Sequence, residues 1–515
     1  MNASPTSAAR LYPWLTPRRA FQAEELRRAG KEIIFTNGAR RATLRPPLSA
    51  TSSHTPPPLT SPLSPPPVGN PHALGEKPLT FNRQVLSLCM LPSLLDHPKV
   101  LELFPAEAVE RARATLNKLK GGMGAYSDSR GSLDIRTEVA AFIQKRDGLP
   151  KPTNPDHIFL TDGASVGVRS MLSALIRDAR DGVLVPIPQY PLYSASIALY
   201  GGSLVPYSLD ESKGWSLDVS GMAAAVAKGR ASGVNARALV FINPGNPTGQ
   251  CLPESNIREL CKFAYDNKIV LMADEVYQEN IYQDKTPFVS ARKVLHGMGE
   301  PYASGVELVS FHTVSKGTLF MYHFFHFLFI FPKGTLGECG LRGGYFEMHN
   351  IDQGTVDEIY KVASINLSPN TVGQAAMSLM VNPPAPGTEA RKQQDAEKAA
   401  ILASLRRRAH MMTDAFNSLE GVTCTFTEGA MYSFPQVRFS PKALAAAKAA
   451  GKAPDVFYCL ALVEETGIST VPGSGFGQEP GTYHLRTTIL PQEAKMVDVV
   501  ARLKKFHAEF VAKYK

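Results

Sequence analysis

Five stretches of this 515-residue chain place chemically useful side chains directly after short apolar, β-branched runs. The side chains are a hydroxyl, an aromatic ring, an amide, a carboxylate and an amine, contributed by Ser165, Tyr190, Asn246, Asp274 and Lys316. In an open α/β sheet, ligands bind outside the carboxyl ends of the strands. We therefore expect these five side chains to line one site.

The chemistry of the five groups narrows the ligand that such a site would take. Ser165, next to glycine at the start of a helix, offers backbone N–H groups and a positive dipole end to a phosphate. Tyr190 suits stacking on a flat ring. Asp274 can pair with a protonated ring nitrogen, and Lys316 can form a Schiff base with an aldehyde. Pyridoxal 5'-phosphate (PLP) combines all four complementary features.

The elements that must position these groups alternate along the middle of the chain. Short β-branched runs are separated by amphipathic stretches, which predicts a mostly parallel sheet with helices on both faces. The predicted strands are His157–Leu160, Val183–Pro186, Ala238–Ile242, Ile269–Met272 and Leu308–Phe311.

Composition excludes several other classes of protein. The chain is 44% hydrophobic and 20% charged, which is typical of a soluble globular protein and excludes collagen-like, coiled-coil and wholly disordered classes. The longest apolar run, Thr318 to Phe331, is shorter than the roughly 20 residues that span a bilayer and contains histidine. The six cysteines include no CxxC pair, so we expect neither a disulfide scaffold nor a metal site.

Two segments do not fit the globular pattern. Gly38–Pro67 is rich in Pro, Ser and Thr and has no acidic residue, so we expect it to be disordered. Gly317–Lys333 contains six Phe, and the tetrapeptide Lys-Gly-Thr-Leu occurs at both of its edges. We interpret both as insertions and hypothesise that they are translated introns. The two segments together carry four basic residues and no acidic one, so the net charge is +9 for the whole chain and +5 for the chain without them. We therefore expect no nucleic-acid partner.

A series of motifs resembles the fold-type I PLP aminotransferases, and within that family the alanine aminotransferases. Their joint order is far more specific than any single one. The motifs are GNPHALG (69–75), GAYSDSRG (124–131), TDGAS (161–165), PQYPLYSA (188–195), NPGNPTGQ (243–250), ADEVYQ (273–278), SFHTVSKG (310–317), GECGLRGGYFEM (337–348), FTEGAMYSFPQ (426–436), DVFYCL (455–460), VPGSGFGQ (471–478) and HLRTTILP (484–491).

The resemblance implies roles for the residues around the ring of the cofactor. Lys316 would be the Schiff-base lysine and the proton shuttle, and Asp274 would keep the pyridine nitrogen protonated. Asn246 and Tyr277 would hydrogen-bond the phenolate oxygen, while Tyr190 would stack on the ring.

The resemblance also implies how the phosphate and the substrate are held. Arg486 would pair with the substrate α-carboxylate through its planar fork, with Gly69 and Asn246 nearby. The residues implied for the phosphate are Ala164, Ser165, Thr313 and Arg342, with Tyr126 reaching it from the neighbouring subunit.

Several residues have an alternative explanation. Asp274 could be a helix N-cap, Tyr190 could be an ordinary core residue, and Arg486 could form a surface ion pair. Lys333 keeps the family's spacing to the phosphate arginine, whereas Lys316 keeps the upstream Ser/Thr context. We favour Lys316 as the reactive amine.

The expected architecture is a large PLP-binding domain with a mostly parallel central sheet, plus a smaller α+β domain. The expected boundaries are 1–37 for an N-terminal arm, 38–67 for the first insertion, 68–120 for the first part of the small domain, 121–378 for the large domain with the 317–333 insertion, and 379–515 for the rest of the small domain.

The expected activity is transamination between L-alanine and 2-oxoglutarate, giving pyruvate and L-glutamate, with amino acids and 2-oxo acids as the only small-molecule partners. Glyoxylate is an alternative acceptor. Two other hypotheses are a homologue impaired by the insertion beside Lys316 and a PLP lyase on the same fold. We expect a homodimer with no membrane association. We expect it to be cytoplasmic, with mitochondrial as the second choice because residues 1–23 lack acids and contain three arginines.

Overall fold

The computed structural model describes residues 34–35, 71–316 and 337–515. Gly69, Lys333, most of the expected N-terminal arm and both predicted insertions lie outside the described residues. Residues 34 and 35 form β1 (Ile34–Phe35), which pairs in parallel with β13 (Ile468–Ser469).

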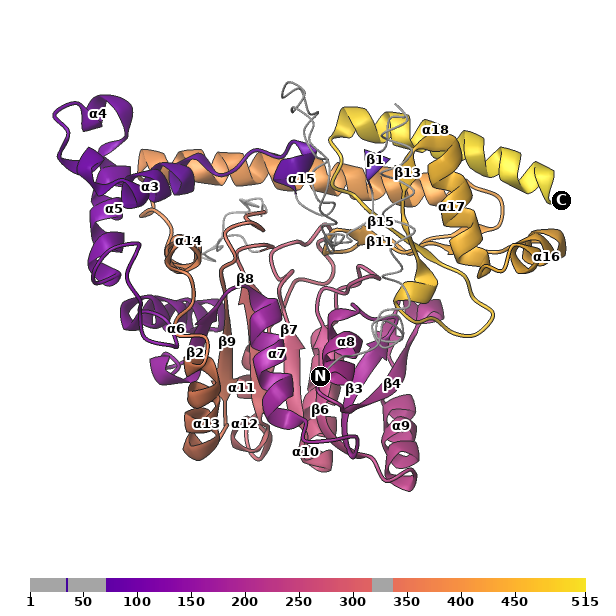
Figure 1. Cartoon of the computed structure of the whole chain (residues 1–515), viewed down its shortest axis with the longest axis horizontal. Coiled ribbons are helices and arrows are strands. Elements are labelled where there is room, and N and C mark those ends of the chain that lie inside the picture. Colours follow the sequence, from indigo (N-terminus) through magenta and orange to yellow (C-terminus); the bar gives the residue numbers. More distant parts are fainter. Residues whose placement is uncertain (1–33, 36–70, 317–336) are drawn as a thin grey trace, which may run out of the picture.

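An eight-stranded sheet forms the centre of the molecule (Figure 1). Its strands lie in the order β2-β9-β8-β7-β6-β3-β4-β5, and all run in one direction except β9 and β5. Their bounds are β2 (Ile158–Thr161), β3 (Asp181–Ile187), β4 (Ser203–Asp210), β5 (Ser216–Leu217), β6 (Asn235–Ile242), β7 (Val270–Asp274), β8 (Leu308–Thr313) and β9 (Gly344–His349). The predicted mostly parallel α/β sheet is confirmed.

Helices cover both faces of this sheet, which explains why its strands read as continuous apolar runs. In β6, Leu239 and Phe241 pack on one face, whereas Val240 and Ile242 pack on the other. The first face is covered by α9 (Val219–Ala231), α10 (Glu254–Asn267) and α11 (Ala291–Met298), with the short α12 (Tyr302–Gly305) beside them. The second face is covered by α7 (Ala164–Leu175), α8 (Leu192–Leu199) and α13 (Gln353–Ser364).

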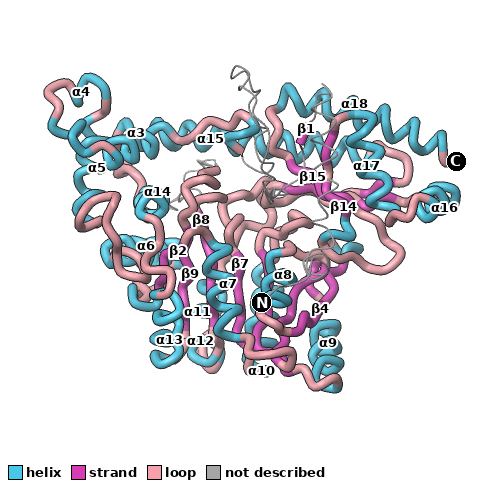
Figure 2. Tube along the Cα trace, in the orientation of Figure 1, coloured by secondary structure: helices cyan, strands magenta, loops and turns pink. Residues whose placement is uncertain are grey.

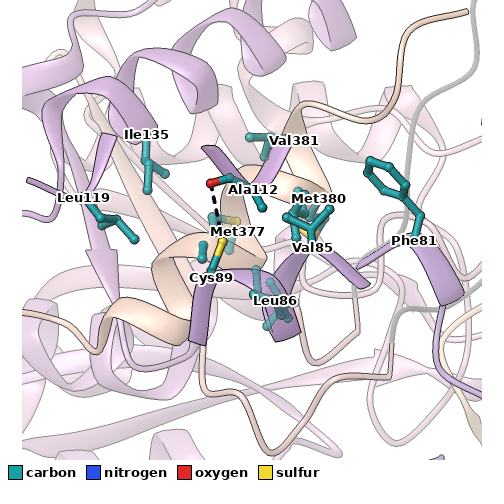
Figure 3. Packing of buried hydrophobic residues seen from close by; sticks show 14 of the residues in the cluster. Phe81, Val85, Leu86, Cys89, Ala112, Leu119, Ile135, Met377, Met380 and Val381 are labelled. Atoms are coloured by element: carbon teal, nitrogen blue, oxygen red, sulfur yellow. Dashed lines mark hydrogen bonds between the residues drawn. The ribbon is translucent and has the colours of Figure 1, made fainter. Parts of the chain in front are cut away.

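A third core lies beside β2, where residues far apart in the sequence meet (Figure 3). Val85 and Cys89 pack against Met377 and Met380, and the Cys89 thiol contacts the carbonyl oxygen of Ala112 at 3.7 Å. The helices that build it are α3 (Thr80–Met90), α5 (Ala106–Lys118), α6 (Leu133–Asp147) and α14 (Thr371–Val381), and the short α4 (Val100–Leu103) lies at its edge. The expected domain boundaries stay a prediction.

The fourth core lies mainly in residues 389–515, which we call the C-terminal lobe, and it also takes in Val276, Tyr277 and Tyr282 from the segment after β7. We call the eight-stranded sheet with its covering helices the sheet lobe. The long helix α15 (Glu389–Asn417) lies above the carboxyl ends of the sheet strands (Figures 1 and 2). The lobe also contains α16 (Pro441–Ala449), α17 (Pro454–Thr466), α18 (Glu493–Lys513), β10 (Val422–Thr423), β11 (Tyr432–Ser433), β12 (Gln436–Val437), β14 (Val471–Pro472) and β15 (Leu485–Thr488).

The sequence led us to expect neither disulfides nor a membrane-spanning helix. All six cysteines lie in the described ranges and carry free thiols. Within those ranges no helix is both long and apolar enough to cross a membrane.

Candidate active site

The carboxyl ends of β2, β3, β6, β7 and β8 meet at one edge of the sheet, facing the C-terminal lobe (Figure 1). This follows from the strand directions: β2 and β8 each pair antiparallel with β9, so they run the same way. Of the five residues selected from the sequence, Asp274 is the last residue of its strand and the other four follow theirs, so all five lie along the same edge. What each one contacts decides whether they form a site.

Lys316 follows β8, and its amine lies close to the C-terminal lobe. Its Nζ is 3.9 Å from the sulfur of Met431 and 5.7 Å from the ring centroid of Tyr277. Burial alone would lower the pKa of this amine, but Tyr432 and Cys339 outweigh that effect and the pKa is raised. Among the described residues no carboxylate contacts this Nζ, so the amine is not held in an ion pair with this part of the chain.

Asp274 is the last residue of β7 and is buried. The next helix, α11, has Ser290 as its N-cap, so the N-cap explanation for Asp274 is wrong. The hydroxyl of Tyr193 donates to Oδ2 of Asp274 at 2.7 Å. Burial raises the pKa of the Asp274 carboxyl to about 6. A buried carboxylate of this kind is stabilised by any positive charge placed against it, such as a protonated ring nitrogen.

Two buried tyrosines connect the lobes beside Lys316. The hydroxyl oxygens of Tyr277, in the turn after β7, and Tyr432, on β11, are 3.1 Å apart. Burial would raise the pKa of Tyr432, but the positive charges of Lys316 and Arg486 outweigh it and lower the pKa. Tyr432 lies in a motif noticed in the sequence, yet no role was predicted for it.

Arg486, on β15, is 3% exposed, so the surface ion-pair explanation is wrong. Its guanidinium carbon lies 4.4 Å from the ring centroid of Tyr432 and 4.6 Å from that of Phe476, so two aromatic rings sandwich the fork. Nη1 donates to Oδ1 of Asn246 at 3.1 Å, whereas the buried Nε–H has no partner among the described residues. A buried guanidinium with an unused donor fits a carboxylate ligand.

An anion cup forms where α7 begins. Nη2 of Arg342 donates to the carbonyl oxygen of Asp162 at 2.8 Å and to Oγ of Ser165 at 3.2 Å. Gly163 precedes the helix with φ 89°, and a Cβ there would come within 2.4 Å of Nη2 of Arg342. Only glycine therefore lets the guanidinium approach the helix N-terminus this closely. Backbone N–H groups, a hydroxyl and a guanidinium together suit a phosphate.

The hydroxyls that follow β8 behave differently from each other. Thr313 Oγ1 donates to the carbonyl oxygen of Gly343 at 2.7 Å and accepts from the Ser315 N–H at 3.2 Å. The buried Ser315 Oγ has no hydrogen-bond partner in the described chain. Sequence reasoning missed Ser315, although its position next to Lys316 was a usable signal. An unpartnered buried hydroxyl beside the cup indicates space for a further polar ligand group.

The remaining predicted residues differ in where they lie. Tyr190 follows β3 and is 39% exposed, so it is not a core residue. Tyr126 is 78% exposed, and no contact with the site of its own chain is seen among the described residues. Gly69 and Lys333 lie outside the described residues, so their predicted roles stay predictions.

The side chains at this edge fit PLP as a set. The anion cup matches the phosphate, Asp274 matches a protonated ring nitrogen, and the Lys316 amine matches the aldehyde. The unpartnered Nε of Arg486 and Oγ of Ser315 are the kind of orphaned polar atoms that a ligand would satisfy.

The sequence profile described as "Aminotransferase class I and II" matches residues 99–321 and 335–503. The match is interrupted within the aromatic segment 317–333. That interruption is expected of an insertion, whatever its origin.

Named relatives match most of the chain. Glutamate–glyoxylate aminotransferase 1 of Arabidopsis thaliana is 56% identical over 493 residues, covering 96% of this chain and 92% of that protein. The probable mitochondrial alanine aminotransferase of Dictyostelium discoideum is 49% identical over 449 residues, covering 87% and 80%. An alanine aminotransferase structure from Pyrococcus furiosus aligns with a TM-score of 0.71 at 20% identity, covering 99% and 100%, which supports the shared fold.

Proposed function

The chain belongs to the class I and II aminotransferases, a PLP-dependent family. From this premise we propose that it exchanges amino groups between L-alanine and 2-oxoglutarate, giving pyruvate and L-glutamate. One observation carries the proposal: the Lys316 amine lies beside Met431, and the Arg486 guanidinium stacks on the adjacent Tyr432. A reactive amine and a carboxylate anchor therefore face the same small region, as an amino-acid substrate requires.

Bound PLP would supply an aldehyde that condenses with amines and a ring that withdraws electrons from the substrate Cα. Lys316 would hold the aldehyde end, and Asp274 would keep the ring nitrogen protonated. Tyr190 would cover one face of the ring, and Asn246 and Tyr277 would hydrogen-bond the ring oxygen. The groups proposed for the phosphate are the N–H of Ala164 and the side chains of Ser165 and Arg342, with Ser315 now added. Thr313 would have to give up the bond that its hydroxyl donates to the Gly343 carbonyl oxygen before it could join them.

The remaining steps are binding of the substrate carboxylate, which we assign to Arg486, and proton transfer, which we assign to Lys316. Arg486 binds and orients the substrate carboxylate, because its fork is already fixed between two rings and against Asn246. The rings of Tyr432 and Phe476 exclude water from that contact and so strengthen it. Lys316 Nζ would take the proton from the substrate Cα and return it, because it is the amine that lies beside Met431 and Tyr277, next to the carboxylate anchor.

The experiment is spectroscopic and chemical. Purified protein with PLP should show a visible absorbance band that shifts when L-alanine is added and returns when 2-oxoglutarate is added. Borohydride reduction followed by peptide mass spectrometry should fix the cofactor on Lys316. A stable band that neither substrate shifts would refute the proposed exchange, and label on Lys333 would refute the choice of lysine.

A second acceptor, glyoxylate, is favoured by one observation. The Arabidopsis relative named for glutamate and glyoxylate is 56% identical and aligns with 96% of the chain, compared with 49% and 87% for the Dictyostelium relative. Initial rates with glyoxylate and with 2-oxoglutarate, each at saturating L-alanine, would decide between the two acceptors.

Two other activities stay as outcomes of the same assays. An impaired homologue is motivated by the insertion beside Lys316, and it would give no visible band with PLP. A lyase would show the band with PLP and would release pyruvate and ammonia from L-serine, which has a leaving group on Cβ, without consuming an oxo acid.

We propose a homodimer in which Tyr126 of each chain completes the phosphate site of the other. Tyr126, Ile365 and Leu367 are 78%, 79% and 56% exposed, and the Ser129 hydroxyl joins their two loops by donating to the carbonyl of Leu367 at 2.6 Å. Exposed apolar side chains on joined loops favour a covered surface. Sedimentation equilibrium should give twice the chain mass, and I365D/L367D should reduce it to the chain mass.

We propose a cytoplasmic location, with mitochondria as the alternative. The name of the Dictyostelium relative includes a mitochondrial location, whereas that of the Arabidopsis relative includes none. Cell fractionation with an antibody to the C-terminal lobe would distinguish the two compartments.

A further inference from the structure

His484 is a buried histidine at the junction of the two lobes, and the proposed reaction does not use it. It is 2% exposed and precedes β15, the strand that carries Arg486. Its Nε2 lies 3.1 Å from Oε2 of Glu211, in the sheet lobe after β4. Its Nδ1 lies 3.0 Å from Oε1 of Gln478.

The hydrogen bonds around His484 define its protonation. The backbone N–H of His484 donates to the same Oε1 of Gln478 at 3.0 Å. Because a peptide N–H can only donate, the Gln478 atom at this position is the oxygen, and Nδ1 must also donate to it. Oε2 of Glu211 also accepts from Nε2 of Gln436 at 2.9 Å, so this oxygen acts as an acceptor and we assign Nε2 of His484 as a second donor to it. With a hydrogen on both nitrogens, the ring is an imidazolium.

A row of rings connects this imidazolium to Arg486. His484 lies flat on Phe434, with centroids 4.8 Å apart and planes at 1°. Phe434 meets Phe476 edge-on at 5.8 Å, and Phe476 is one of the two rings that sandwich the Arg486 guanidinium. His484 and Arg486 are two residues apart along an extended segment, so their side chains share a face.

We propose that His484, held as an imidazolium by Glu211 and Gln478, is a positioning residue for Arg486, and this rests on the proposed role of Arg486 in binding a carboxylate. The Glu211–His484 ion pair ties β15 to the sheet lobe, and the flat contact with Phe434 fixes the rings against which the guanidinium rests. Two neighbouring contacts tie the same segment to the sheet lobe. Glu479 accepts from the Ser208 hydroxyl, and the Gln189 N–H donates to the Phe476 carbonyl oxygen at 2.8 Å.

The first test measures substrate binding separately from turnover. H484Q and E211Q should raise KM for L-alanine about 10-fold, equivalent to about 1.4 kcal/mol, and change kcat less than about 2-fold. The Kd for propionate, which has the carboxylate but not the amino group, should rise by the same factor. The matched control is D284N, which breaks a different inter-lobe ion pair, Arg406–Asp284 (2.8 Å). D284N should leave KM and Kd unchanged.

The second test asks whether His484 acts through Arg486. In an R486K background, H484Q should raise the propionate Kd less than 2-fold, because the positioned group is already altered. An equal 10-fold rise in both backgrounds would overturn the inference, and so would wild-type constants in E211Q. If H484Q does not fold, KM and the propionate Kd of E211Q decide whether the inference holds. If wild type does not react with L-alanine, the proposed function fails, and the propionate Kd still tests the inference.

A third measurement reports the charge of His484 without any substrate. The chain has two tryptophans, Trp14 and Trp215, and the ring of Trp215 lies 5.7 Å from that of His484. An imidazolium quenches indole emission at such a distance. In a W14F background, H484Q should therefore increase Trp215 emission, whereas D284N should not. Equal emission with and without His484 would show that the ring is not charged.

Discussion

Replacing Asp274 by Asn should stabilise the protein when no cofactor is bound, although it should damage cofactor binding. Burial raises the pKa of the Asp274 carboxyl from 3.8 to about 6. Asn cannot ionise, and its amide oxygen can still accept the hydrogen bond from Tyr193. The substitution therefore removes the unfavourable buried charge and keeps the bond from Tyr193, at the cost of the longer bond that Oδ1 of Asp274 accepts from the Val276 N–H at 3.4 Å.

The size and sign of this effect follow from linkage. Below pH 3.8 the Asp274 carboxyl is protonated in both the folded and the unfolded chain, so its ionisation does not lower the free energy of unfolding. As the pH rises towards 6, the unfolded chain ionises first and stability is lost. Above pH 6 the loss is complete, at about 3 kcal/mol for a shift of about two pKa units. With an unfolding entropy of about 1 kcal/mol per kelvin for a chain of this length, D274N should raise the apoprotein Tm by about 3 °C at pH 8.

Thermal unfolding of cofactor-free protein at pH 8 and pH 5 is the appropriate assay. The advantage of D274N should fall to about half at pH 5, because Asp274 is then mostly protonated in the folded state. PLP should raise the Tm of wild type more than that of D274N, because Asn cannot pair with a charged ring nitrogen. Y193F is the matched control: it keeps the carboxyl, removes its hydrogen bond and should lower the apoprotein Tm at pH 8. An apo D274N that is no more stable than wild type at pH 8 would refute the argument.

Three further substitutions test other parts of the site. R486K should raise KM for L-alanine about 30-fold, because it replaces charge-assisted hydrogen bonds of about 2 kcal/mol with one point charge. Steady-state kinetics measures the change, and the absorbance of the bound cofactor should stay the same. S315A should weaken PLP affinity about 5-fold, or about 1 kcal/mol, in equilibrium dialysis, and unchanged affinity would show that its hydroxyl faces no ligand. G163A should lose PLP on gel filtration, because residue 163 has a φ of 89° and the new Cβ would lie 2.4 Å from Nη2 of Arg342. The control G233A, also at positive φ but with no atom within 4 Å of its Cβ, should retain PLP.

The sheet and most of the candidate site were predictable because both depend on local pattern. All five predicted strands are present, and the polar residues after them lie along one edge, since parallel strands must end together. The sequence analysis missed the other three strands of this sheet. They are β4, in which exposed and buried residues alternate, the two-residue β5, and β9, which runs antiparallel between β2 and β8.

The missed site residues depend on contacts between distant parts of the chain. Tyr432 meets Tyr277 across 155 residues, and Tyr193 meets Asp274 across 81, so no spacing in the sequence indicates either pair. His484 was part of a quoted motif, but its partner Glu211 lies 273 residues away. Exposure decided the alternatives for Tyr190 and Arg486, because it is a property of the folded chain rather than of a motif, and the start of α11 at Ser290 decided the alternative for Asp274.

The antiparallel strand β9 affects how the chain can tolerate extra length. Thr313 and Gly344 pair directly in the β8–β9 ladder although thirty residues separate them, and the Val314 N–H donates to the Gly343 carbonyl oxygen at 3.0 Å. The connection thus leaves and re-enters the sheet on adjacent strands, as in a hairpin. Doubling the length of such a loop costs only about 0.6 kcal/mol of closure entropy. Insertions that keep the reading frame would therefore cost the pairing of β8 and β9 little at this turn.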